Sequence, residues 1–90
     1  MAWKVELEAG AKKDLEKLDK QSAKRVVTFL AKRVASNQDP RSIGQALKGS
    51  HLGAFWKYRV GDYRTICDIQ DKKLVVLVLR VGHRREIHSR

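Results

Sequence analysis

The chain has 90 residues, 42% hydrophobic and 33% charged, which is typical of one globular domain over 1–90 and excludes two separate cores or a disordered chain. Twenty Lys and Arg against ten Asp and Glu give a net charge of +10, so we expect an anionic partner, either a nucleic acid or an acidic protein. A single cysteine, Cys67, excludes an internal disulfide and fits a reducing cytoplasm. The longest apolar run, 74–79, is far shorter than the ~20 residues that span a bilayer, so we expect a cytoplasmic protein without a membrane segment.

The first half of the chain predicts one strand and two helices. Strict alternation of apolar and charged residues indicates a strand over 3–8. Leucines three residues apart predict a short helix over 11–18, and apolar residues at three- and four-residue spacing predict a longer one over 21–37. We interpret the outer face of the second helix, which carries Arg33 among other cations, as a solvated surface. The segment 37–40 ends that helix, and an ordered loop is expected over 43–52.

The second half predicts three strands. The runs 55–60 and 63–69 flank Gly-Asp, a hairpin signal. The run 74–81 is apolar at both parities, which indicates a central strand covered on both faces. We therefore predict the α+β class, with two N-terminal helices packed on a four-stranded antiparallel sheet, in the order strand, helix, helix, strand, strand, strand.

Cations concentrate on one face of the predicted hairpin. Lys57 and Arg59 share a parity opposite to the aromatic residues of their strand, and pairing across the turn brings Arg64 near Arg59. Arg84 and His88 reach the same surface if the C-terminal tail folds back. Such cations repel one another unless an anion lies among them, so the pattern favours a phosphate-binding face over a merely hydrated strand surface.

Cations with a histidine are suited to cutting RNA without a metal ion. One group must take the proton of the ribose 2′-hydroxyl, others must stabilise the pentavalent phosphate, and one must protonate the departing 5′-oxygen. A lysine crowded by arginines can act as the base, because like charge disfavours its protonated form, and a histidine can do so unaided. Lys57 and His88 therefore both remain candidates for the general base.

No cofactor or metal is expected. The nearby carboxylates, Asp62 in a turn and Glu86 in the tail, are too scarce to provide the clustered oxygen ligands of Mg²⁺. The three histidines, His51, His83 and His88, lack the spacing of zinc ligands.

The segments 56–64 and 80–88, read together, resemble the RelE branch of the RelE/ParE toxins of bacterial type II toxin–antitoxin systems. The resemblance implies a microbial ribonuclease-like fold and an endoribonuclease that cuts translated mRNA in the A site of the 70S ribosome, inhibiting translation. It also implies a cognate acidic, RelB-like antitoxin. Complexes of higher order would bind operator DNA through that antitoxin.

The same resemblance implies roles for individual residues. Lys57 and Arg59 would fall on the family's basic pair for proton transfer and phosphate positioning, although Arg59 is a poor base because a guanidinium does not readily deprotonate. Arg64 would clamp the transition state, Arg84 would lie near the leaving group, and His88 would occupy a position that is often Tyr. We expect Arg64 and Arg84 at the surface. The implied RNA-binding residues are Lys57, Arg59, Arg64, Arg80, His83, Arg84 and Arg85.

Two other functions remain open. The ParE branch is similar in fold but poisons DNA gyrase and cuts no RNA; the joint presence of the five implied catalytic residues favours RelE. A non-enzymatic nucleic-acid-binding module would need only the positive charge.

Overall fold

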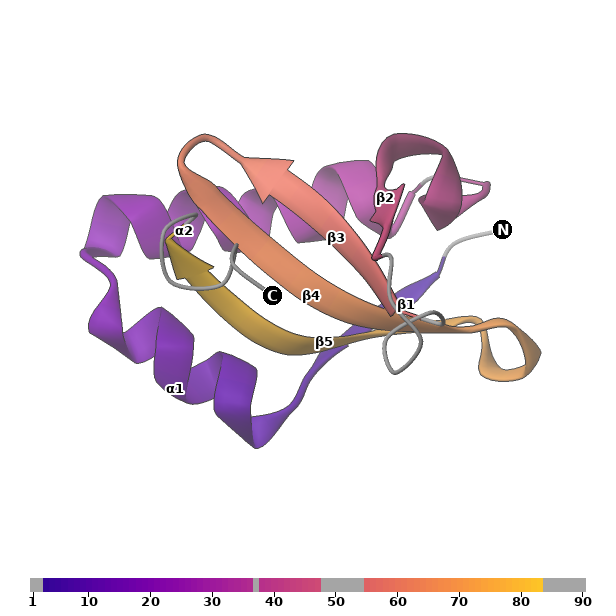
Figure 1. Cartoon of the computed structure of the whole chain (residues 1–90), viewed down its shortest axis with the longest axis horizontal. Helices are drawn as coiled ribbons and strands as arrows, with labels where there is room; N and C mark the ends of the chain where they lie inside the picture. The colour runs from indigo at the N-terminus through magenta and orange to yellow at the C-terminus, as the bar shows by residue number, and fades with distance from the viewer. Residues whose placement is uncertain (1–2, 37, 48–54, 84–90) are drawn as a thin grey trace.

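The computed structural model describes residues 3–36, 38–47 and 55–83. The chain alternates from a strand to helices and back to strands (Figure 1). Its elements are β1 Lys4–Leu7, α1 Ala9–Lys17, α2 Lys20–Phe29, the π-helical turn η1 Leu30–Val34, the 3₁₀ turn η2 Pro40–Ile43, β2 Gln45–Ala46, β3 Phe55–Val60, β4 Tyr63–Gln70, the 3₁₀ turn η4 Asp71–Lys73 and β5 Val75–His83.

The sheet has five strands in the order β1-β5-β4-β3-β2, and β1 runs parallel to β5 while the other neighbours are antiparallel. The α+β class is confirmed, but the prediction of a four-stranded antiparallel sheet is wrong. The extra strand, Gln45–Ala46, lies in the region predicted as a loop and is too short to produce an alternating pattern. The apolar strand β5 does lie inside the sheet, between β1 and β4, as its composition predicted.

The two helices occupy different places around this sheet. Figure 1 shows α2 behind β3 and β4, whereas α1 lies alongside β5. Asp19 begins α2 by accepting a hydrogen bond from the Ser22 backbone N–H at 3.1 Å. The helical path ends at Val34, three residues before the predicted end. Within the described ranges no helix is both long and apolar enough to cross a membrane.

The main core lies between α2–η1 and the rear face of the sheet. Tyr58 is fully buried there, its ring centroid 6.1 Å from that of Phe29. Its hydroxyl donates to the Pro40 carbonyl at 2.8 Å, which satisfies the one polar atom of the ring system and ties β3 to η2. The core also includes Val26, Leu30 and Val34 from the helical side and Val60, Cys67, Ile69, Val76, Val78 and Val81 from the strands.

Candidate functional site

The face of β3 and β4 that points away from this core carries the predicted basic residues. Along β3, Lys57 and Arg59 alternate with the buried Tyr58 and Val60. Arg59 lies directly opposite Arg64 of β4, and cross-strand partners project from the same face of a sheet. The parity argument therefore placed these three cations correctly.

A cleft of about 240 Å³ brings the three cations together with residues from the helical side. Pockets that enclose drug-sized ligands measure ~300–1,000 Å³, so this cleft can take part of a polymer, such as one phosphate or one base. Its lining holds four cations and no carboxylate, a composition that favours an anionic ligand. The lining residues are Phe29, Arg33, Ile43, Gln45, Lys57, Arg59 and Arg64.

Arg64 is buried, which corrects the expectation of a surface side chain. Only 6% of Arg64 is exposed, whereas Arg59 opposite it is exposed to solvent. A charge held in the less polar interior acts on a neighbouring anion more strongly than one in bulk water. Arg64 is thus the cation of this cleft best placed to stabilise a charge that develops during a reaction.

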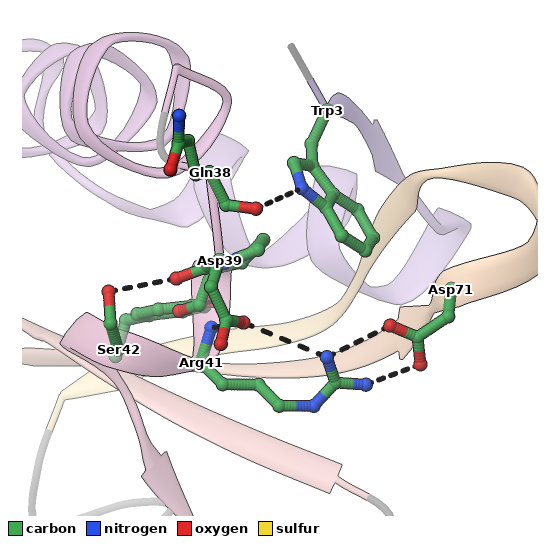
Figure 2. A network of polar contacts seen from close by, with 8 residues as sticks. Trp3, Gln38, Asp39, Arg41, Ser42 and Asp71 are labelled. Atoms are coloured by element: carbon green, nitrogen blue, oxygen red, sulfur yellow. Dashed lines mark hydrogen bonds and ion pairs between the residues drawn. The ribbon is translucent and has the colours of Figure 1, made fainter. Parts of the chain in front are cut away.

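Residues 38–45, which bring Ile43 and Gln45 to the cleft, are tied to the rest of the chain by polar contacts (Figure 2). Arg41 binds Asp71 through two bonds, Nη1 to Oδ1 at 2.9 Å and Nη2 to Oδ2 at 2.5 Å. The indole Nε1 of Trp3 donates to the carbonyl of Gln38 at 3.2 Å. These contacts connect the segment to Trp3, which directly precedes β1, and to η4, so residues outside the cleft hold one of its walls in place.

The charge of Arg41 is stabilised by its neighbours Asp71 and Trp56. The hydrogen bond from Arg41 holds the pKa of Asp71 below its ordinary value, so the carboxylate is ionised at neutral pH. The Arg41 guanidinium carbon also lies 5.9 Å from the ring centroid of Trp56, within cation–π range. Arg41 was not a predicted site residue, and nothing in its local sequence indicates a partner thirty positions away.

Arg80 and His83 lie in a different cleft from Lys57. This second cleft, of about 440 Å³, is lined by Asp14, Lys17, Leu18, Tyr63, Arg80, Val81, Gly82 and His83. Arg80 does not extend toward the first cleft, because its Nε donates to Asp14 Oδ2 at 2.8 Å. The structure thus places Arg80 and His83 apart from Lys57, and their contact with RNA stays a prediction.

The other predicted residues, Arg84, Arg85 and His88, and also His51, lie outside the described residues. Sequence reasoning missed Phe29, Arg33, Ile43 and Gln45 as cleft residues. Arg33 was visible as a cation on the outer face of its helix, but its helical periodicity gave no sign that this face meets the edge of β3. No group of three or more His, Cys, Asp and Glu side chains that could hold a metal occurs in the part of the chain that the structure describes.

Residues 5–88 match the family model described as "ParE toxin of type II toxin-antitoxin system, parDE". The chain belongs to this toxin family. The predicted membership of the RelE/ParE superfamily is thereby confirmed. Over 90 residues, all of both chains, the toxin is 32% identical to Toxin RelG of Mycobacterium tuberculosis.

Solved structures agree with this assignment. One match is the toxin–antitoxin complex RelBE2 from Mycobacterium tuberculosis, at 29% identity and a TM-score of 0.85, covering 96% of the toxin and 95% of the matched chain. Another is the archaeal RelE-RelB complex from Pyrococcus horikoshii, at 26% identity and a TM-score of 0.73, covering 96% and 99%. Both likenesses extend over nearly the whole toxin.

Proposed function

We propose that the toxin is a RelE-type, ribosome-dependent endoribonuclease that cuts translated mRNA in the A site without a metal ion. The observation that supports this most directly is the first cleft, where Lys57, Arg59 and Arg64 meet around a space the size of one phosphate or base. A gyrase poison needs no such cluster. The similarity to Toxin RelG and to the RelBE2 complex agrees with the RelE branch.

In this proposal the cleft holds the scissile phosphate of the RNA. The ribose 2′-oxygen attacks phosphorus while the bond from phosphorus to the 5′-oxygen breaks, leaving a 2′,3′-cyclic phosphate and a free 5′-hydroxyl. Lys57, or His88 from the tail, takes the 2′-hydroxyl proton, and a protonated group returns one to the 5′-oxygen. Arg59 binds the phosphate, and the buried Arg64 stabilises the additional negative charge of the transition state. Arg84 is proposed to act near the leaving group.

A second part of the proposal concerns the partner. We propose that an acidic, RelB-like antitoxin holds the toxin inactive and connects the complex to operator DNA. The matched structures include the RelBE2 complex and a RelE-RelB complex, and the charge of +10 favours fast association with an acidic chain. An apolar hollow of about 160 Å³ between β1 and α2, beside the 45% exposed Val27, offers a surface for its apolar residues.

Cleavage is tested by adding purified toxin to a translation reaction and mapping cuts in the message by primer extension. We expect cuts in phase with the codons, only in translated RNA. Lys57→Ala and Arg64→Ala should each lower the cleavage rate more than tenfold, since a general base typically contributes ~10²–10⁴-fold and one oxyanion contact is typically worth about 3–4 kcal/mol. Lys13→Ala, which removes an exposed cation on α1 that lines neither cleft, should cleave as the unmodified toxin does.

The rival functions give different results. Equal cleavage of untranslated RNA would contradict ribosome dependence. Growth arrest with DNA damage and intact message would identify a gyrase poison. This alternative stays open because the matching family model is described as a ParE toxin. RNA binding with neither effect would leave only a nucleic-acid-binding module.

A further inference from the structure

The first cleft has a charged side and an uncharged side. Its four cations line the space that we assign to the scissile phosphate. The remaining lining residues carry no charge and have no part in the proposed chemistry; they are Phe29, Ile43 and Gln45. Gln45 belongs to β2, an edge strand of the sheet, and its side chain is exposed. A nucleoside attached to the phosphate can therefore lie against this uncharged side, at the rim of the cleft.

The strand register places Gln45 beside Lys57. The two residues are direct partners in the antiparallel pairing of β2 with β3, and such partners project from one face of a sheet with their Cβ atoms ~4.5–5.5 Å apart. Lys57 is a candidate to take the proton of the 2′-hydroxyl, which belongs to the nucleotide on the 5′ side of the cut. Gln45 is therefore adjacent to that nucleotide when Lys57 acts on it.

The backbone that carries Gln45 is held in place. The N–H of Gly44 donates to the Arg41 carbonyl at 3.2 Å, and Arg41 is in turn bound to Asp71. Gly44 also packs so closely on Tyr58 that a Cβ atom there would lie 2.9 Å from Tyr58 Cε1. A side chain on a fixed backbone loses less freedom when it binds a ligand, so its recognition is more selective.

The carboxamide of Gln45 matches adenine better than guanine. It presents one donor and one acceptor side by side, whereas lysine and arginine side chains only donate. On the outer edge of a purine, adenine offers the N6 amino donor beside the N7 acceptor, but guanine offers two acceptors, O6 and N7, which suit a cation. Phe29 and Ile43 supply apolar surface for the face of the base, and the contact of Phe29 with Tyr58 holds its ring in place.

We propose that Gln45 selects adenine at the nucleotide immediately 5′ of the cut, with its carboxamide bound to N6 and N7 and the base resting on Phe29 and Ile43. This inference rests on the proposed cleavage, with Lys57 on the 5′ side. It adds a base preference that the cations cannot supply, because contacts to phosphate carry no sequence information. Gln45 takes no part in proton transfer, so cleavage itself should survive its replacement.

The test uses purified toxin and ribosomes stalled on messages with one mapped cut site, identical except for adenine or guanine immediately 5′ of the cut. Below saturation with toxin, the two rates report relative kcat/KM values. We expect the adenine message to be cut at least ~5-fold faster, the lower end for one bidentate base contact. Gln45→Leu should cut both messages at the slower rate, and Gln45→Arg should cut the guanine message faster.

Gln21→Leu is the matched control, because Gln21 is an exposed glutamine of α2 that lines neither cleft. This variant should keep the preference of the unmodified toxin. A second pair of messages varies the nucleotide 3′ of the cut, where Gln45→Leu should change nothing.

Three results would overturn the inference while the proposed cleavage stands. The unmodified toxin might cut the adenine message no faster than the guanine message, Gln45→Leu might keep the adenine preference, or the preference that it loses might lie only on the 3′ side. Absence of any cleavage by the unmodified toxin is distinguishable from all three and would overturn the proposed function together with the role of Gln45.

Discussion

Arg59 of β3 and Arg64 of β4 lie directly opposite each other in the hairpin ladder, so two guanidinium side chains share one position of the same sheet face. Like charges at opposed positions destabilise a sheet. The arrangement is unfavourable for the isolated toxin and becomes favourable when an anion lies between the two cations. This pairing therefore supports the proposed phosphate site.

Replacing Arg59 should separate these two effects. We predict that Arg59→Gln raises the free energy of unfolding by a few tenths to about 1 kcal/mol, because the repulsion with Arg64 disappears. The same variant should cut translated mRNA at least tenfold more slowly, because a phosphate contact is lost. Urea denaturation and primer extension measure the two quantities. A variant that is both less stable and fully active would contradict the assignment.

Gly44 makes room for the ring of Tyr58. A Cβ atom at this position would lie 2.9 Å from Tyr58 Cε1, and Tyr58 is fully buried and cannot withdraw freely. We predict that Gly44→Ala lowers the free energy of unfolding by about 1–3 kcal/mol through overpacking. In a double-mutant cycle with Tyr58→Leu, the combined loss should be smaller than the sum of the single losses. Additive losses would mean that the two residues do not interact in this way.

Asp14 should make the toxin sensitive to acid. Burial acts to raise its pKa, but the bonds from Arg80 and Val81 outweigh burial and hold the folded-state pKa below the ordinary value of 3.8. Its stabilising contribution is therefore present above that value and is lost as the pH falls toward the folded-state pKa. Asp14→Asn should therefore be less stable than the unmodified toxin at pH 7, and the difference should shrink below about pH 4. Urea titrations across this range measure it. If the stability difference between the unmodified toxin and Asp14→Asn instead grew as the pH fell, the prediction would be wrong.

Cys67 should be chemically inert in the folded toxin. It is fully buried in β4, and burial raises its thiol pKa to about 12. Because the thiolate is the reactive form, we predict almost no reaction with an aromatic disulfide reagent at pH 8 in native buffer and rapid reaction in urea. The rate of absorbance change measures this. Fast native labelling would show that β4 opens readily.

The parts of the fold and of the candidate site that could be predicted are those with a local pattern. Alternation along 55–60 placed Lys57 and Arg59 opposite Tyr58, and the apolar content of 74–81 placed β5 inside the sheet. The direction of β1 could not be predicted, because a half-buried strand has the same period whether its neighbour is parallel or antiparallel. Arg41 and Asp71 likewise meet only through tertiary packing.

The orientation of Arg80 could not be predicted for a different reason. Strict alternation from the buried Val76 and Val78 would put Arg80 in the core, but the register between β4 and β5 shifts after Ile66, so that Val81 takes the buried position instead. A β-bulge of this kind redirects every later side chain of its strand and leaves no consistent mark in the sequence. The sequence pattern does not show that Arg80 and His83 lie in a different cleft from Lys57; the register of the paired strands does.

The parallel pairing of β1 with β5 also has a consequence for synthesis of the toxin. Lys4 pairs with Val75, so the strand made first must wait for the strand made last. Contacts between such distant positions form slowly, because a long loop must close before they contribute stability. During translation β1 thus remains unpaired until β5 has left the ribosome, and for that interval the nascent toxin cannot complete the sheet that carries its proposed active cleft.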